Sequence, residues 1–245
     1  MDITSNNLVT KLLNHIPDFL DFEKSQRWLV KGKKLIHKLS EKDIMEAEIM
    51  SLEWGQIEEE RKQPFGLYQS KSWRQFVLCT FFADIISYSN SVDQVSFDRL
   101  LFIMHAFPQG FRCWWIKLPN GIYWPVGYTG WYPMLESTFD VFRKYPEKLK
   151  DRMVVPNMNV NLDGQNPYLY LFNFSVISEF KKSVLAKSLI KAYVKDILAL
   201  APAGLACITV SKDGIRIAER LDMSHVGDLI IDGSVENVYV KRFNR

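Results

Sequence analysis

The sequence contains few cysteines, and their positions fit neither a disulfide framework nor a zinc site. Cys79, Cys113 and Cys207 are an odd number, lie far apart and form no CxxC pair. Disulfide frameworks and zinc sites both use recognisable cysteine spacings that are missing here. The four histidines form no HxxxH pair either, so they give no sign of a helical zinc site. We therefore expect reduced, buried thiols and no metal.

Signals for export or membrane insertion are also missing. The first residues, MDITSNNLVTKLLNHIPDF, lack the basic segment and the unbroken apolar stretch of a secretory signal. The richest apolar run, FVLCTFFADII, is shorter than the roughly 20 residues that cross a bilayer, and it contains Asp84. We expect no membrane span and a cytoplasmic protein, while export by a route without a cleaved signal stays open.

Charge of one sign is not concentrated in this chain. The 31 Lys and Arg residues are interspersed with 28 Asp and Glu residues and leave a net charge of +3. No sequence-wide basic field for nucleic acid is therefore expected, although a local basic patch stays open. The chain has no Walker loop and no GxGxxG, HExxH or GxSxG motif. These absences argue against P-loop, dinucleotide-binding, zinc-protease and serine-hydrolase chemistry.

What is present is the composition of a folded globular protein. Hydrophobic residues make up 47% of the 245 residues and charged residues 24%, as in ordinary globular domains. This length suffices for one large domain or for a small domain with a comparable extension. We predict two modules, a mainly helical region over residues 1–107 and an α/β domain over residues 108–245.

Apolar residues at steps of three and four predict helices in the first region. The first helix is expected from Leu8 to Phe22, with Asn7 as its N-cap and with Pro17 ending or kinking it. In the segment from Trp28 to Trp54 the first half fits a helix or a strand, and Ser40 opens a capped helix. Two more helices are expected, at residues 72–88 and 97–107.

The pattern changes to strands at Phe111. Two runs rich in aromatic and β-branched residues flank Asn120 and Gly121, a pair that accepts positive φ in a tight turn and so predicts a β-hairpin. A helix is expected from Glu136 to Leu149. From Tyr168 onward the order is β, α, β, α, β, β. This order predicts an α/β fold with a parallel strand pair, right-handed crossovers and a final hairpin.

Seven aromatic residues gather in and around the predicted hairpin. Side chains alternate between the two faces of a strand, so we expect about half of these rings in the core. The exposed remainder would form a groove for a substrate or a peptide, with Tyr128, Trp131 and Tyr132 as candidates for substrate binding. The cluster consists of Trp114, Trp115, Tyr123, Trp124, Tyr128, Trp131 and Tyr132.

The segment from Tyr168 to Leu198 is expected to form a strand, a turn and a helix. A helix that begins where a strand ends presents free backbone N–H groups and the positive end of the helix dipole. This arrangement suits a pyrophosphate. Every β–α turn has the same geometry, so the arrangement alone does not identify a site.

The residues around this turn resemble a known family. VISEFKKSVLAKSLIKAYVKD, followed by CITVSKDGIRIAERLDM, is similar to the core of the GNAT acetyltransferase superfamily. In that family a strand leads into an Arg/Gln-x-x-Gly-x-Gly/Ala turn and then a helix. Lys181 falls at the Arg/Gln position, Val184 at the first Gly and Ala186 at the second. With the hairpin around Asn120 and Gly121, the resemblance covers about residues 108–243.

The resemblance implies a GNAT-like mixed central sheet flanked by helices, preceded by a helical N-terminal extension. It implies acetyl-CoA or another acyl-CoA as cofactor, and an amine of a protein or a small molecule as acceptor. The amine would attack the bound thioester directly, without a covalent enzyme intermediate. Backbone groups from Phe174 to Val176 would hold the pantetheine arm. The pyrophosphate would lie at Lys181, Lys182, Ser183, Val184, Leu185 and Ala186.

The sequence departs from the family pattern at two places. Val184 replaces a glycine, and a β-branched residue disfavours positive φ and adds bulk near the pyrophosphate. Ala218 stands where many family members have a tyrosine that protonates the leaving thiolate. Two alternatives therefore stay open: a non-catalytic module with this fold that binds a protein partner, and an unrelated α/β domain.

A general base for the amine would be a Glu, a His or a water held by the backbone. Glu136 is a candidate because it follows the second strand of the hairpin. The alternative is an ordinary solvated carboxylate in the first turn of a helix, where Asp and Glu are common.

Overall fold

The structure is a computed structural model that describes residues 3–57, 69–149, 154–160, 162, 166–181, 183–231 and 233–243. Its helices are α1 (Ile3–Leu13), α2 (Phe22–Ile36), α3 (Glu41–Glu46), α4 (Lys71–Ser87), α5 (Phe97–Ala106), α6 (Glu136–Lys144), α7 (Val184–Ala199) and α8 (Lys212–Arg220). Its strands are β1 (Glu48–Glu53), β2 (Phe111–Lys117), β3 (Tyr123–Met134), β4 (Tyr168–Val176), β5 (Gly204–Thr209), β6 (Ser224–Ile231) and β7 (Ser234–Arg242).

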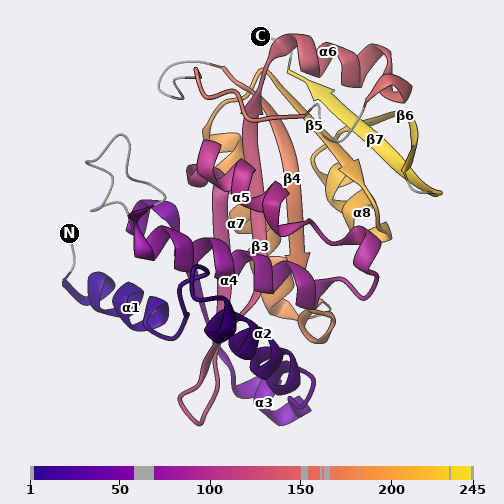
Figure 1. Ribbon diagram of the computed structural model, residues 1–245. Coiled ribbons are helices and arrows are strands. Elements are labelled where there is room, and N and C mark those ends of the chain that lie inside the picture. Colours follow the sequence, from indigo (N-terminus) through magenta and orange to yellow (C-terminus); the bar gives the residue numbers. More distant parts are fainter. Residues whose placement is uncertain are drawn as a thin grey trace. The chain divides into compact units, whose positions relative to one another are not determined.

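The strands form one seven-stranded mixed sheet in the order β1-β2-β3-β4-β5-β7-β6 (Figure 1). β4 and β5 are parallel, whereas β1–β2, β5–β7 and β6–β7 are antiparallel. Helix α7 connects the parallel pair, and α8 connects β5 to the β6–β7 hairpin. The predicted α/β class and the predicted order of elements after Tyr168 are therefore confirmed.

The chain divides into two compact units. The first contains residues Met1–Thr129 and Ser175–Lys182, and the second contains Gly130–Phe174 and Ser183–Arg245. Helices α1–α5, strands β1 and β2 and the first half of β3 belong to the first unit. Helices α6–α8, strands β5–β7, the rest of β3 and most of β4 belong to the second. The division into modules at residue 108 stays a prediction.

The first unit is built around α4, whose interior holds one buried acid. Asp84 is fully buried, and its two oxygens have separate partners. The Tyr128 hydroxyl donates to Oδ1 at 2.8 Å, and the Val95 backbone N–H donates to Oδ2 at 2.8 Å. Because a buried carboxylate is costly without hydrogen bonds, these contacts tie β3 and the segment before α5 to α4.

A second polar contact fixes the segment between α1 and α2. Arg74 of α4 donates to both oxygens of Asp18, with Nε–Oδ1 at 2.8 Å and Nη2–Oδ2 at 2.7 Å. Both side chains are mostly buried. Desolvation opposes ionisation of Asp18, but the hydrogen bonds and charge of Arg74 outweigh it and lower the pKa of this carboxyl.

The N-terminal helices differ from the prediction in their bounds. α1 begins at Ile3, ahead of the predicted N-cap Asn7, and ends at Leu13, four residues before Pro17. Apolar periodicity continues across this break, which is why the sequence suggested one helix as far as Phe22. The capped start at Ser40 is confirmed, since Ser40 and Asp43 form a reciprocal capping box.

The predicted hairpin is present, but its turn is of another type. Gly121 has a φ of 80°, whereas Asn120 keeps a negative φ. Gly121 N donates to Leu118 O and Leu118 N donates to Ile122 O, each at 2.8 Å. This is a three-residue loop in which a type I turn precedes a left-handed glycine. Pro119 explains the difference, because its fixed φ suits the second position of a type I turn.

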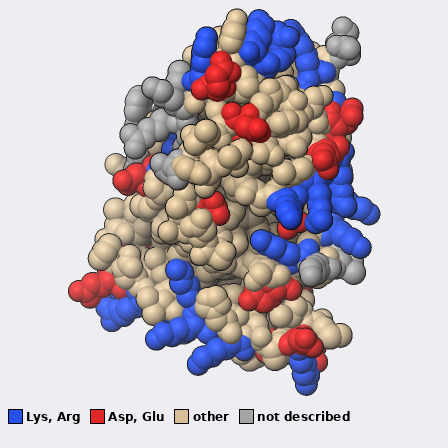
Figure 2. Space-filling model, turned by 90° about the vertical axis from the view of Figure 1, so that its right-hand side faces the viewer, with Lys and Arg blue, Asp and Glu red and all other residues tan. Residues whose placement is uncertain are grey.

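The surface carries both signs of charge close together. On the face drawn in Figure 2, Lys and Arg side chains gather in several groups, and Asp and Glu lie beside them. This pattern is consistent with the small net charge of +3. Within the part of the chain that the structure describes, no helix combines the length and the apolar character needed to cross a bilayer.

The buried Tyr128–Asp84 hydrogen bond should contribute more to stability than the exposed Tyr168–Glu136 hydrogen bond. Tyr128→Phe is expected to lower the free energy of unfolding by about 1–2 kcal/mol, because it leaves a buried carboxylate oxygen without its donor. Tyr168→Phe removes a similar hydroxyl–carboxylate bond at the surface and should change stability by less than about 0.5 kcal/mol. Urea unfolding of both variants measures the difference, and equal losses would contradict it.

The Asp18–Arg74 contact should make stability depend on acid pH. Because the folded-state pKa of Asp18 lies below 3.8, its contribution is complete above that value and is lost as the pH falls through the lowered folded-state pKa. Asp18→Asn is expected to cost about 2 kcal/mol at pH 7 and less at pH 3, because pH 3 lies below the unfolded-state value of 3.8. Urea unfolding at both pH values tests this, with Asp21→Asn at the exposed cap of α2 as the control.

Candidate functional site

The candidate site lies in the second compact unit, where the parallel strands β4 and β5 stop pairing. The pairs are Tyr168–Gly204, Leu169–Leu205 and Tyr170–Ala206. Beyond these three pairs β4 runs on to Val176 and β5 to Thr209 without a shared ladder. The β4–β5 ladder therefore ends after Tyr170 and Ala206, before either strand ends.

Side-chain exposure along β4 changes at the same place. Leu169, Tyr170 and Leu171 are buried, but the next three residues, Phe172 to Phe174, are all half-buried. A strand in the middle of a sheet normally alternates or is buried on both faces. These three half-exposed residues follow directly after the end of the β4–β5 ladder.

Helix α7 begins later than the sequence suggested. The predicted helix started near Glu179, whereas a short 3-10 turn covers Ser178–Phe180 and α7 starts at Val184. Ser183 is the reason, because its backbone is extended and its hydroxyl accepts a hydrogen bond from Ala186 N at 3.4 Å. Val184 is the first helical residue and does not adopt a positive φ.

The predicted cofactor residues fall in different places. Ser183, Val184, Leu185 and Ala186 form the capped first turn of α7. The ring of Phe174 lies 5.8 Å from that of Tyr193, which is also on α7. Val176 is buried and Lys181 is exposed, and both belong to the first compact unit. Lys182 lies outside the described residues.

Two buried groups near α7 are held in their neutral forms. The Tyr193 hydroxyl donates to Gly130 O at 3.1 Å, and burial, with a smaller contribution from Cys207, raises its pKa well above 10. Burial also raises the pKa of the Cys207 thiol, on β5, to about 12. At neutral pH neither group is an anion, so Cys207 does not have the thiolate that a nucleophilic cysteine needs.

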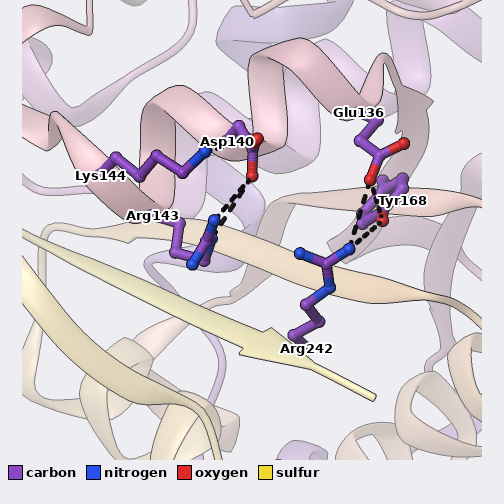
Figure 3. Close-up of polar contacts among 6 residues, drawn as sticks. All are labelled: Glu136, Asp140, Arg143, Lys144, Tyr168 and Arg242. Carbon is purple, nitrogen blue, oxygen red and sulfur yellow. Dashed lines mark hydrogen bonds and ion pairs between the residues drawn. The ribbon is translucent and has the colours of Figure 1, made fainter. Parts of the chain in front are cut away.

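Glu136 contacts a tyrosine and an arginine at the far end of β4 (Figure 3). Its Oε1 accepts from the Tyr168 hydroxyl at 2.7 Å and from Arg242 Nη2 at 3.4 Å. The hydrogen bond to Glu136 raises the pKa of Tyr168. Tyr168 precedes Phe174 by six residues, or about 20 Å of strand. Glu136 thus joins the starts of α6 and β4 to the end of β7, at the opposite end of β4 from the first turn of α7.

The other polar group in Figure 3 lies on α6 alone. Asp140 accepts from Lys144 Nζ at 2.9 Å and from Arg143 Nη2 at 3.2 Å. The Lys144 hydrogen bond, with a smaller one from Arg143, lowers the pKa of Asp140. These are exposed contacts at helical spacing, which is the ordinary pattern of a solvated helix face.

The aromatic cluster is more buried than predicted. All seven rings are buried, including Tyr128, Trp131 and Tyr132, so the expected exposed half is wrong. Tyr128 donates to Asp84, and Tyr132 donates to Val154 O at 2.9 Å while packing against Tyr170 and Phe172. Dense aromatic runs lie in the core here because large rings supply much of the apolar area that the fold buries. Substrate contact by the three residues stays a prediction.

Comparison with known proteins identifies the fold. No model of a protein family matches the sequence, and no curated protein matches it either. Among solved structures, the loading GNATL domain of CurA from Lyngbya majuscula superimposes with a TM-score of 0.51 at 8% identity, covering 80% of this chain and 97% of that chain. At this identity the likeness shows the fold alone.

Two other solved structures match with lower TM-scores. A chain of the NatC complex bound to Gag peptide and CoA has a TM-score of 0.48 at 10% identity, over 80% of this chain and 99% of that chain. Ard1 from Thermoplasma volcanium has 0.45 at 9% identity, over 81% and 99%. The CurA match alone shows the fold: the chain has the GNAT fold, as the residues around Lys181 to Ala186 suggested.

The divergence of β4 from β5 has no sequence signal of its own. One feature that could have been read is Gly204 at the start of β5, where a Cβ would lie 2.8 Å from the Phe139 ring and 2.9 Å from Tyr168. Glycine at the entrance of a strand often marks such a close approach. The cap at Ser183 could also have been read, since serine followed by an apolar run is a helix-start signal.

The neutral state of Cys207 is open to direct test. With a pKa of about 12, only about one thiol in 10⁵ is ionised at pH 7, so iodoacetamide should leave Cys207 unmodified in the folded protein. The buried Cys79 and Cys113 are internal controls, and all three should react in urea. Peptide mass spectrometry gives the result. Fast modification of Cys207 alone in the folded protein would instead indicate a nucleophilic thiol.

Proposed function

We propose that this protein transfers an acyl group from acetyl-CoA, or another acyl-CoA, to an amine of a protein or a small molecule. The observation that carries the proposal is the end of β4–β5 pairing after Tyr170 and Ala206, in the same compact unit as the first turn of α7. A strand that continues beyond its parallel partner would offer an extended backbone to the pantetheine arm, and a helix N-terminus would offer N–H groups to the pyrophosphate.

The residues present fit this cofactor in most respects. The proposal assigns the pantetheine arm to backbone groups of Phe174 to Val176, at the end of β4. The first turn of α7 offers N–H groups that no helical carbonyl can satisfy, and the Ser183 hydroxyl lies beside them. Val184 takes a helical conformation, so the positive φ of the family's glycine is not required there. The proposal also assigns Lys181 and Lys182 to the phosphates.

The chemistry of the chain's own residues favours direct transfer. A bound acyl-CoA supplies a thioester whose carbonyl an amine can attack. Cys207 is neutral at physiological pH, which argues against an acyl-cysteine intermediate. Tyr193 keeps its proton and donates a hydrogen bond to Gly130 O. Its role is therefore to support β3. The proposal leaves deprotonation of the amine to a water held by backbone groups, because Glu136 is engaged elsewhere.

A second candidate function is partner binding without catalysis. One observation favours it: the Ser183 hydroxyl already satisfies Ala186 N, an amide that a phosphate would otherwise bind. The buried Ala218 of α8 stands at the position of the family's tyrosine, so no acid is supplied there. The two functions differ in one measurable respect, because only the first requires acyl-CoA to bind.

Isothermal titration with acetyl-CoA tests the proposed function. Ser183→Asp keeps an N-cap of equal quality but puts a negative charge where the pyrophosphate would lie, so it should weaken binding at least about tenfold with little loss of stability. Ser211→Asp makes the same change at the cap of α8 and should leave binding unchanged. Lys181→Glu should also weaken binding.

The outcomes separate the two candidate functions. Binding that Ser183→Asp weakens and Ser211→Asp does not would support a cofactor site at α7 and justify a screen of amine acceptors. No heat at millimolar acetyl-CoA would overturn the transferase proposal and leave partner binding as the better account. Equal weakening by both aspartates would mean that the charge acts at a distance, not at the site.

A further inference from the structure

The first compact unit contains a pocket that is separate from the residues proposed to hold acyl-CoA. Its volume is about 420 Å³, and α2, the turn after α1 and the β2–β3 hairpin line it. Figure 1 shows that hairpin beside α2. The charged side chains that line it are Lys31, Lys34 and Lys38, and no Asp or Glu is among the lining residues. The pocket is therefore positive on one side.

The three lysines share one face of α2 and its C-terminal extension. They follow each other at steps of three and four residues, a spacing that puts like charges side by side and is unfavourable for a helix. Among the described residues none of them has an ion-pair partner, although other cations of the same region do, such as Lys24 with Asp21. An anion in the pocket would relieve this repulsion.

Aromatic rings also line the pocket. Trp28 is half-buried and lies 5.3 Å from Trp124, ring centre to ring centre. Tyr123 carries His15 stacked at 5.6 Å and Lys11 at 5.2 Å from its ring centre. Planar rings of this kind stack against flat ligands, and Trp28 has the most exposed surface of the pocket's three large rings.

A glycine in the middle of α2 builds this arrangement. At Gly32 a Cβ would lie 2.5 Å from the Phe82 ring and 2.8 Å from the Trp124 ring. Only a glycine lets the helix come this close to the aromatic wall, although glycine is a poor helix former. This close approach brings α2 against Trp124, which lines the pocket together with the lysines.

We propose that this pocket binds a small anion that carries a planar ring, of the class of a nucleoside monophosphate. The lysines would bind the phosphate or carboxylate, and Trp28 would stack on the ring. The size of the pocket favours a small molecule over a polymer, since 420 Å³ is near the lower end of typical ligand pockets. The inference does not depend on the proposed acyl transfer.

Titration with GMP, monitored by tryptophan fluorescence and calorimetry, tests the inference. Lys34→Glu is expected to weaken GMP binding at least about tenfold. The matched control is Lys33→Glu, because Lys33 is the next residue of the same helix, is exposed and does not line the pocket. Both variants place the same charge at the same end of α2, so their effects on helix stability should be equal.

Two partial ligands and one site variant complete the design. Guanosine lacks the anion and inorganic phosphate lacks the ring, so each should bind at least about tenfold more weakly than GMP. Ser183→Asp, which is at α7, should leave GMP binding unchanged. Binding should also weaken with added salt, because the lysines are exposed.

Each outcome decides the inference. Loss of binding in Lys34→Glu with retention in Lys33→Glu supports it. No binding of GMP at millimolar concentration, or equal loss in both variants, overturns it. Phosphate that binds as well as GMP overturns the stacking role of Trp28. A short single-stranded oligoribonucleotide that binds at least about tenfold more tightly than GMP overturns the assignment to a small ligand and indicates a nucleic-acid site.

Discussion

The three-residue pairing of β4 with β5 is the constraint on which the second compact unit depends. Parallel strands require a crossover, and α7 supplies it between them. Gly204 permits the pairing, because any side chain there would collide with Phe139 of α6 and with Tyr168. The same glycine therefore fixes α6 on this part of the sheet. Pairing stops after Tyr170 and Ala206, so the second half of β4 continues without a ladder to β5.

Most of the fold could be predicted from the sequence, because its signals are local. Alternating and helical periodicities placed the strands and helices after Phe111, and the order of elements then implied a parallel pair. Bounds were missed where a polar side chain competes with periodicity. The Ser183 cap puts the start of α7 at Val184, later in the chain than predicted. Pro119 changes the type of the turn before Gly121. The match to the CurA domain covers 80% of this chain, which is more than residues 108–243 make up. The likeness therefore includes elements before residue 108.

The candidate site could be predicted only in part. The family pattern pointed to Lys181 to Ala186 as the phosphate segment, but periodicity predicted the helix from about Glu179, whereas α7 starts at Val184. Spacing could not show that β4 and β5 diverge, since separation of strands depends on contacts far apart in the chain. Nor could it show that Tyr128 and Tyr132 are buried, because their partners Asp84 and Val154 are 44 and 22 residues away. The lysine pocket was missed since its walls come from three segments.

The cap on α7 affects how any anion would be selected there. The Ser183 hydroxyl stabilises the first turn, so the turn is ordered before any ligand binds. When a ligand binds a preformed turn, the protein chain loses little conformational entropy. Affinity would then rank anions by charge and size alone, since no induced folding adds to the differences between them. A helix start that formed only when its ligand bound would show far larger differences in affinity between anions.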